Sequence, residues 1–401
     1  MALEFLVPII GDHMAPIMFI GLVVFLLSGY PVAFALAANG LLFGLLGIGM
    51  GMFTPDFLQA LPNRIFGIMA NDTLLAIPFF TFMGLILERS GMAEDLLDTI
   101  GQLFGPVRGG LAFAVIFVGA LLAATTGVVA ASVISMGLIS LPIMLRYGYD
   151  RKLATGVIAA SGTLAQIIPP SLVLIIMADQ LGRSVGDMYA GAMIPGLVLT
   201  GMYVGYVALV AFFKPAAAPA LPLSARTVTG TKLLVRSLVV LVPPLFLIFL
   251  VLGTIFLGIA TPTEGGAMGA AGAMLLAISK GKLTWGLTRQ AVDSTAKLSA
   301  FVLFILVGAT VFGLVFRGVN GDLWVEHLLT SLPGGQLGFL IAVNILFFVL
   351  AFFLDFFELA FILVPLVGPV AEKMGIDLIW FGVLLGVNMQ TSFMHPPFGF
   401  A

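Results

Sequence analysis

Long runs of apolar residues, separated by short charged or Gly/Pro-rich interruptions, fill most of this chain. A helix that crosses a bilayer needs about 20 apolar residues, and successive crossings are separated by charges or turns. The pattern therefore predicts an all-α polytopic membrane protein. Runs long enough for crossing helices lie at 65–88, 186–213, 237–257, 258–279 and 293–317, with two more on either side of Gly29-Tyr30-Pro31.

The composition agrees with a chain that lies in the lipid bilayer. Hydrophobic residues make up 61% of it and charged residues 9%, with a mean hydropathy of +1.19, whereas a soluble domain carries roughly 25% charged residues. The net charge of −2 and the lack of a basic tail give no support for a nucleic-acid partner. Because the chain has no Cys, disulfides, Cys-bound zinc and iron–sulfur clusters are excluded. The first apolar run lacks a signal-peptide pattern and is predicted to be retained.

Basic residues predict the orientation of the helices. By the positive-inside rule their clusters belong in the cytoplasm, so 153–178 and 186–213 leave the cytoplasm and return, and the N-terminus is periplasmic. A Pro/Ala-rich cytoplasmic linker at 215–236 then divides a first unit, 1–214, from a second, 237–401. The three basic clusters lie at 146–152, 214–236 and 280–289.

The same set of turn residues occurs twice, at a constant offset of 227 positions. Prolines remove backbone donors and break helices, so 153–178 and 378–401 are predicted to be broken transmembrane helices. Broken helices at matching places in two halves are typical of the central site of a secondary transporter. The matching residues are Pro142, Gly148, Asp150 and Pro169-Pro170 in the first half, and Pro369, Gly375, Asp377 and Pro396-Pro397 in the second.

One further apolar segment in each half carries a polar interruption at its middle. The first, 109–145, is interrupted at Thr125-Thr126-Gly127, and the second, 337–370, at Asp355 and Glu358. The arms are short for full crossings, so both segments are predicted to be re-entrant helical hairpins with tips buried in protein. The first hairpin opens to the cytoplasm and the second to the outside. The fold is therefore predicted to consist of two inverted-topology repeats.

Oxygen-bearing residues concentrate at the hairpin tips and at the breaks. Hydroxyls, carbonyls and carboxylates are hard ligands that suit Na⁺ better than a transition metal, and a tip opposed to a broken helix would form one oxygen cage per half. The candidate sodium ligands are Thr125, Thr126, Gly127, Gly162, Thr163, Ser171, Asp355, Glu358, Asn388, Thr391 and Ser392. The candidate substrate-binding residues are Pro169, Pro170, Gln390, His395, Pro396 and Pro397.

Structural roles for several of these residues stay open. Asp355 and Glu358 could lie in an exposed loop, although a charge at membrane depth costs roughly 2.5–3.5 kcal/mol. A membrane proline can be a mere kink. His395 fits a satisfied polar side chain beside the break better than a metal ligand, because the other two His lie far away in sequence. Glu264, after Thr261-Pro262-Thr263, fits a helix cap better than a functional role.

Several motifs together resemble the large membrane subunit of tripartite ATP-independent periplasmic (TRAP) transporters, and the resemblance covers essentially the whole chain. It implies an elevator transporter of the ion-transporter superfamily in the bacterial inner membrane, with sodium as the coupling ion and no other cofactor. It also implies two partners, a small four-helix membrane subunit and a periplasmic substrate-binding protein that delivers organic anions. The motifs are Leu-Leu-Ala-Ile-Pro-Phe-Phe (74–80), Arg-Ser-Gly-Met-Ala-Glu-Asp-Leu (89–96), the stretch 159–171, Ala-Thr-Pro-Thr-Glu (260–264) and Asn-Met-Gln-Thr (388–391).

The resemblance places two sodium sites where each hairpin tip meets its broken helix. Two departures leave individual ligands open: Thr125-Thr126 stand where family members often have Ser or Gly, and His395 stands where they often have Thr. Only 398–401 follow the second Pro-Pro pair, whereas a long apolar stretch follows the first, so we expect that the sequence is truncated.

Other function classes agree less well with the sequence. A self-sufficient sodium/carboxylate symporter of the same superfamily would share the hairpins and breaks but would need no binding protein. An intramembrane enzyme would need two facing Asp residues or a paired nucleophile and base. Asp355 has no obvious Asp partner and His395 no motif-defined Ser. A channel fits two inverted halves around one central site less well than alternating access does.

Overall fold

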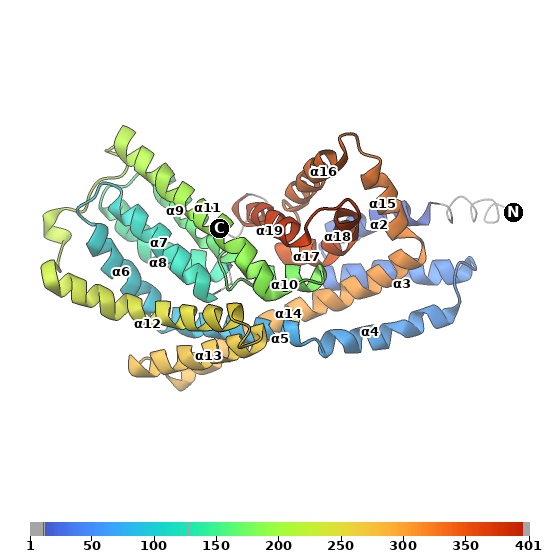
Figure 1. Ribbon diagram of the computed structural model, residues 1–401, viewed down its shortest axis with the longest axis horizontal. Helices are drawn as coiled ribbons and strands as arrows, with labels where there is room; N and C mark the ends of the chain where they lie inside the picture. Colours follow the sequence, from blue (N-terminus) through green and yellow to red (C-terminus); the bar gives the residue numbers. More distant parts are fainter. Residues whose placement is uncertain (1–10, 12, 127–128, 396–401) are drawn as a thin grey trace.

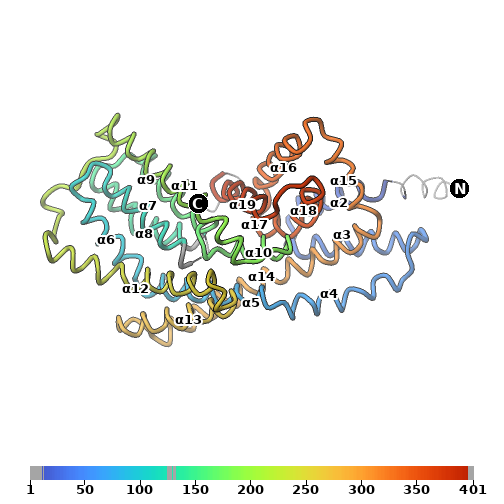
Figure 2. Tube along the Cα trace, viewed as in Figure 1, coloured from blue at the N-terminus to red at the C-terminus, as the bar shows by residue number. Residues whose placement is uncertain are grey.

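The computed structural model describes residues 11, 13–126 and 129–395, and this part of the chain contains helices and no strand, which confirms the predicted all-α fold. Figures 1 and 2 show an elongated molecule in which most helices run along the long axis. In chain order the elements are α2 (Met14–Leu27), α3 (Val32–Gly49), η1 (Pro55–Gln59), α4 (Ala60–Met69), α5 (Asp72–Arg89), α6 (Met92–Phe104), α7 (Gly110–Thr126), α8 (Val129–Arg146), α9 (Arg151–Thr163), η2 (Leu164–Gln166), α10 (Leu172–Gln180), α11 (Val185–Phe213), η3 (Leu223–Ala225), α12 (Gly230–Phe256), α13 (Pro262–Ser279), α14 (Trp285–Gly318), α15 (Gly321–Thr330), α16 (Gly335–Leu350), α17 (Phe356–Ile362), α18 (Val364–Lys373), α19 (Leu378–Met389) and α20 (Thr391–Met394).

The helices repeat along the chain at the offset found in the sequence. Helix α8 spans Val129–Arg146, and α17 and α18 together occupy the positions 227 residues later, Phe356 to Lys373. Helix α9 begins at Arg151 and α19 at Leu378, each capped by the aspartate before it. The repeat therefore includes the boundaries of the helices as well as the Pro-Pro pairs.

Small residues allow helices from the two halves to pack closely on each other in the lower layer of Figure 1. Helix α13 of the second half packs along α5, and α3 of the first half packs along α14. A Cβ added at Gly269 would lie 2.5 Å from the Met83 sulfur, and one at Gly308 would overlap the backbone of Ala33. Glycine is therefore required at Gly308, where the neighbour is backbone, whereas at Gly269 the flexible Met83 side chain would have to move.

The upper layer contains the helical hairpins and broken helices. Helices α7 and α8 pack on α9 and η2, α16 and α18 pack on α19, and α17 packs on α18, with α10 in contact with elements of both halves. Figure 1 shows the first hairpin towards the left end and the second towards the right. Both hairpins and the first broken helix thus occur at the positions predicted for them.

Four described helices, α3, α11, α12 and α14, are long and apolar enough to cross a membrane. The pair formed by η1–α4 and α5 bends by 46°, and α15 and α16 meet at 118°. Helices α7, α8 and α19 are apolar but shorter. Short arms are the expected property of re-entrant hairpins and broken helices, which do not cross the bilayer alone.

The end of the predicted linker, 215–236, has to be corrected. Helix α12 already begins at Gly230, so the last residues of the predicted linker are helical. Lys232 and Arg236 suggested a loop because they are charged, but Arg236 lies on the first turns of α12 and forms an ion pair with Asp98 on α6. A long basic side chain can occupy a helix end at the membrane surface while its head group remains polar.

The non-helical part of the linker crosses the base of the first hairpin. The amides of Gly109 and Asp150 donate to the carbonyls of Ala218 and Ala217, at 2.9 and 3.0 Å. Beside them the Tyr149 hydroxyl accepts a hydrogen bond from the Leu111 amide at 3.1 Å, and burial raises the pKa of Tyr149 to about 12. These contacts connect the open end of the hairpin to the segment that joins the two halves.

Candidate functional site

The first broken helix is interrupted between η2 and α10. Helix α9 ends at Thr163, η2 follows, and the chain is non-helical through Pro169 and Pro170 until α10 begins at Leu172. The Ser171 hydroxyl closes the break, because it donates to the Gln166 carbonyl at 2.5 Å and accepts from the Leu174 amide at 3.5 Å. The Pro-Pro pair therefore separates two helix ends instead of bending one helix.

The first hairpin packs closely on this broken helix. A Cβ at Gly119 of α7 would lie 2.6 Å from the Ser161 Cβ, and one at Gly162 would overlap Val133 of α8. Of the residues predicted at the hairpin tip, Thr125 and Thr126 end α7, and their side chains, like all of Gly127, lie outside the described residues.

The second broken helix shows a comparable arrangement as far as it is described. Helix α19 ends at Met389, the short α20 follows, and His395 has an extended backbone with φ −119° and ψ 142°. Pro396 and Pro397 lie outside the described residues. The His395 ring stacks on Phe352 from the second hairpin, with ring centroids 3.8 Å apart. The hairpin and the break are thus in direct contact.

Asp355 and Glu358 lie at the tip of the second hairpin and are 8% and 6% exposed. The alternative of an exposed loop is therefore wrong. The two carboxylates form a capping box at the start of α17: Asp355 Oδ1 accepts from the Glu358 amide at 2.9 Å, and Glu358 Oε2 accepts from the Asp355 amide at 3.0 Å. Phe356 contacts Phe393 of α20, with ring centroids 5.8 Å apart. The acidic tip therefore lies beside the second break.

Hydroxyl groups at both breaks already donate hydrogen bonds to backbone carbonyls. Thr163 donates to the Ala160 carbonyl at 2.8 Å. In the second half Thr391 donates to the Asn388 carbonyl at 2.8 Å, and Ser392 to the Met389 carbonyl at 2.7 Å. A hydroxyl has one proton and two lone pairs, so while these hydrogen bonds hold, each oxygen is free only to accept. Such oxygens are suited to bind a cation and unsuited to bind an anion.

The comparisons with known proteins agree with this architecture. Residues 19–401 match the family described as the tripartite ATP-independent periplasmic transporter, DctM component. The chain belongs to this family. It is 31% identical to the C4-dicarboxylate TRAP transporter large permease protein DctM of Pseudomonas aeruginosa, over 87% of this chain and 80% of that protein. It is 28% identical to the sialic acid TRAP transporter large permease protein SiaM of Vibrio cholerae, over 94% and 85%.

A solved structure supports the fold alone. The YdaH transporter of Alcanivorax borkumensis, whose structure is described as having an unusual topology, matches with a TM-score of 0.56 and 15% sequence identity, over 86% of this chain and 80% of that one. The present chain is therefore the large membrane subunit of a TRAP transporter, a transport protein and not an enzyme, as the resemblance of its motifs implied.

Several polar atoms at the breaks of this TRAP permease are buried and lack a hydrogen-bond partner. They are Ser161 Oγ and both polar atoms of the Gln166 side chain in the first half, and Gln390 Nε2 and both ring nitrogens of His395 in the second. An unsatisfied buried polar group costs about 1–3 kcal/mol, so each calls for an explanation such as a ligand or ion. Ser161 and Gln166 were not among the site residues predicted from the sequence, although a polar residue between apolar ones just before Pro-Pro is a signal for such a role.

The two breaks of the permease lie next to each other. Helix α20 contacts α9, and the Ile167 side chain lies 3.8 Å from the Cβ position of Gly386 on α19. Asn388 adds a link to the second hairpin, because its side-chain amide donates to the Asn344 carbonyl at 2.9 Å. No Lys or Arg is among the buried residues in the part of the chain that the structure describes. The region thus offers oxygens, amides and an imidazole, and no fixed basic charge.

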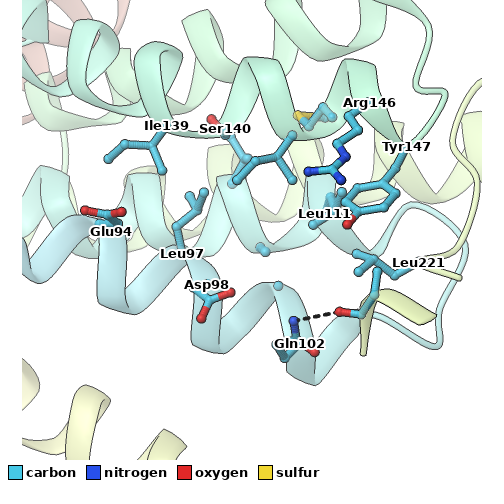
Figure 3. A pocket seen from close by; sticks show the side chains of 16 residues that line it. Glu94, Leu97, Asp98, Gln102, Leu111, Ile139, Ser140, Arg146, Tyr147 and Leu221 are labelled. Atoms are coloured by element: carbon cyan, nitrogen blue, oxygen red, sulfur yellow. Dashed lines mark hydrogen bonds between the residues drawn. The ribbon is translucent and has the colours of Figure 1, made fainter. Parts of the chain in front are cut away.

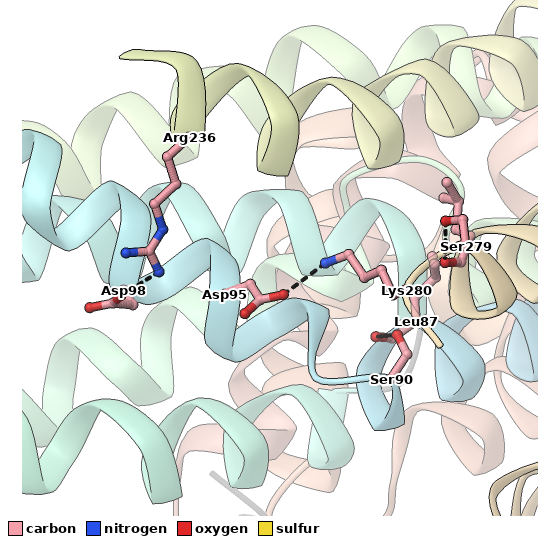
Figure 4. Close-up of polar contacts among 8 residues, drawn as sticks. Leu87, Ser90, Asp95, Asp98, Arg236, Ser279 and Lys280 are labelled. Carbon is pink, nitrogen blue, oxygen red and sulfur yellow. Dashed lines mark hydrogen bonds and ion pairs between the residues drawn. The ribbon is translucent and has the colours of Figure 1, made fainter. Parts of the chain in front are cut away.

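Helix α6 connects the two layers of the permease and is held to the lower one. Figure 4 shows its two ion pairs: Asp98 with Arg236 of α12 at 2.7 Å, and Asp95 with Lys280 after α13 at 2.8 Å. On its other side a cavity of about 300 Å³ lies between α6, α7 and α8, and its lining includes Leu97, Ile139 and Arg146 (Figure 3). Helix α6 thus packs on α7 of the first hairpin as well as on α12 and α5 of the lower layer, and its ion pairs lie on the lower-layer side.

Proposed function

We propose that this TRAP permease imports small organic acid anions across the inner membrane, coupled to a sodium gradient. The observation that carries the proposal is the donor and acceptor pattern at the breaks. The hydroxyl oxygens of Thr163, Thr391 and Ser392 have only lone pairs left, and no buried basic side chain occurs in the described residues. An anion in such a site needs a cation beside it, and hard oxygen ligands favour Na⁺ over softer metals.

The names of the relatives support the substrate class. They describe transporters of C4-dicarboxylates, of sialic acid and of 2,3-diketo-L-gulonate. We extend to this chain the property that these compounds share, a carboxylate on a small polar molecule. The proposed cation sites are those predicted from the sequence, with Thr163 and Ser171 at the first break and Asp355, Asn388 and Thr391 at the second.

An elevator motion agrees with the way the layers are connected. The ion pairs of Asp95 and Asp98 join α6 to Lys280 and to Arg236 of the lower layer, and on its other side α6 meets the first hairpin through packing against α7 and across a cavity. We propose that the two hairpins and broken helices move as one body against the lower layer. The hairpins have their open ends at opposite ends of the molecule, as inverted repeats require (Figure 1).

The orientation in the membrane follows from charge. A basic residue lies at one terminus of each of four helices: Arg146 ends α8, Arg151 begins α9, Lys214 follows α11 and Lys280 follows α13. We propose that these four helix termini face the cytoplasm. The N-terminus and the open end of the second hairpin would then be periplasmic.

Partners follow from the family. The family description names a tripartite periplasmic transporter of which DctM is one component, and the isethionate TRAP transporter permease protein DctMQ of Oleidesulfovibrio alaskensis is 27% identical over 96% of this chain and 59% of that protein. The present chain thus matches only part of DctMQ. We propose that it works with a separate small membrane subunit and a periplasmic substrate-binding protein.

Uptake into proteoliposomes tests the proposal. The full transporter, with its small subunit and its binding protein, is supplied with C4-dicarboxylates, sialic acid or 2,3-diketo-L-gulonate under a sodium or a choline gradient. We expect uptake of at least one acid only with sodium and only with the binding protein present. Equal uptake in choline would contradict sodium coupling. Sodium-driven uptake without binding protein would instead indicate a self-sufficient symporter.

A further inference from the structure

Gln166 is the most unusual polar residue of the first break. Its side chain is 0% exposed, and neither Oε1 nor Nε2 has a hydrogen-bond partner. The residue ends η2, against which both arms of the first hairpin pack. A primary amide that is fully buried with both ends unpaired is costly in free energy. A group that pairs with it in another step of the transport cycle would remove this cost.

The hydroxyl side chains beside Gln166 already use their protons. The hydroxyls of Thr163 and Ser171 donate to the carbonyls of Ala160 and Gln166, so their remaining capacity is to accept. Among the side chains described at this break, the unused donors are the NH₂ group of Gln166 and the hydroxyl of Ser161, and the first backbone amides of α10 are free donors as at any helix start. The Gln166 amide has two protons and is the stronger candidate for a carboxylate.

The other end of the amide points to a cation. Oε1 of Gln166 is an unpaired acceptor on the same break as the Thr163 and Ser171 hydroxyls, and a set of oxygen acceptors attracts positive charge. No buried Lys or Arg in the described part of the chain could neutralise a bound carboxylate. A cation that enters with the substrate would balance its charge.

We infer that the Gln166 side-chain amide binds the transported anion and links it to the coupling ion, with Nε2 donating to a substrate carboxylate and Oε1 facing Na⁺. The inference rests on the proposed function and names a residue that connects its two ligands. A primary amide is suited to this position because it presents a donor and an acceptor on one planar group. It follows that substrate should bind well only when sodium is present.

Two substitutions of Gln166 distinguish the role of its Nε2 donor from that of its Oε1 acceptor. Gln166→Glu keeps the size and the oxygen but replaces the donor by a negative charge. Gln166→Met keeps the unbranched shape and removes both polar atoms. The matched control is Asn39→Leu, since Asn39 on α3 is also 0% exposed and has an unpartnered Oδ1, yet lies in the lower layer away from the breaks.

The measurements are the unfolding temperature of the full transporter in sodium or choline chloride, and uptake of the acid that the wild type transports. For Gln166→Glu we expect the stabilisation by sodium to persist while the KM for uptake rises about tenfold or more. For Gln166→Met we expect loss of the stabilisation by sodium and loss of uptake. The unfolding temperature in choline should not fall, since the apolar side chain removes two buried polar atoms that lack partners. Asn39→Leu should retain the stabilisation by sodium and the uptake.

The inference fails if Gln166→Met transports with the KM and sodium dependence of the wild type. It also fails if Gln166→Met loses transport together with its stability in choline, because that result assigns Gln166 a packing role. A wild-type transporter whose uptake does not depend on sodium contradicts the proposed function itself, before any variant is compared.

Discussion

Asn388 on α19 donates from one side-chain nitrogen to both oxygens of Asn344 on α16, to the carbonyl at 2.9 Å and to the side chain at 2.8 Å. This pair connects the second broken helix to the first arm of the second hairpin. Because one nitrogen donates to two oxygens, loss of this donor removes both contacts. Loss of either acceptor leaves the other contact in place.

The first prediction concerns this donor. Asn388→Asp should lower the free energy of unfolding by about 1–3 kcal/mol, because carboxylate oxygens would then face the oxygens of Asn344. Thermal unfolding of the purified transporter measures the effect. Gln336→Glu is the matched control, since Gln336 also donates to a carbonyl, that of Met374, but at an exposed place. Equal stability of the Asn388 variant and the wild type would show that the contact is dispensable.

Asp355→Asn should separate capping from ion binding. An amide oxygen can still accept the bond from the Glu358 amide, so the start of α17 should be preserved while a cation loses a charged ligand. We expect the sodium concentration for half-maximal uptake to rise by about tenfold or more, with normal membrane insertion. Asp377→Asn is the control, because Asp377 caps α19 in the same way at an exposed position. An unchanged sodium dependence would leave Asp355 with a structural role only.

The Pro-Pro break should be needed for transport. Replacing Pro169-Pro170 by Ala-Ala lets the helix restore backbone hydrogen bonds between η2 and α10, so we expect loss of sodium-coupled uptake with the protein still inserted. The chain offers a matched control in Pro243-Pro244, which lie inside α12 without interrupting it. If Ala-Ala at 169–170 left uptake as intact as Ala-Ala at 243–244, the site would be misplaced. The corresponding pair Pro396-Pro397 should be needed independently.

Filling the cavity beside α6 should hinder the movement proposed for the two hairpins and broken helices. Ala114 is buried and lines the cavity between α6 and the first hairpin. We expect Ala114→Phe to reduce the rate of uptake by about tenfold or more without lowering sodium-dependent stabilisation. Leu138→Phe, on the exposed face of α8, should have no effect. Wild-type uptake by the Ala114 variant would argue against movement of the hairpin relative to α6.

Single Cys residues test the orientation cleanly, because the chain has none of its own. Ser224→Cys in the linker should react with an impermeant maleimide only from the cytoplasmic side, and Asp187→Cys at the start of α11 only from the periplasmic side. Both positions are exposed. Labelling of both from one side would contradict the inverted arrangement of the two halves.

Much of the fold could be predicted because breaks and charges are local signals. Pro169-Pro170, the interruption at Thr125 and the acids at 355 and 358 each stand out against apolar neighbours, and helices end at all three places. Pro-Pro alone does not predict a break, however. Pro243-Pro244 lie within the continuous helix α12, so the surroundings of the pair decide the outcome.

The site could be predicted less completely because it depends on contacts between distant segments. The sequence pointed to Thr163 and Asp355 as oxygen ligands, but the direction in which a hydroxyl donates is set by the helix around it. The position of Gln166 among apolar residues before Pro-Pro marks it as unusual, but the sequence does not show that both ends of its amide lack partners. Likewise, Asn344 has no neighbour in sequence that points to its pairing with Asn388.

The exchange of α3 and α13 between the halves has a consequence for synthesis in the membrane. Helix α5 is made early, yet α13, which covers Phe79 and Met83, follows much later, and the bond from Thr263 to the Asp72 carbonyl joins residues 191 positions apart. The first half must therefore wait in the bilayer with its packing surface exposed to lipid until the second half is inserted. A chain split at the linker should yield two fragments that depend on each other for survival against membrane proteases.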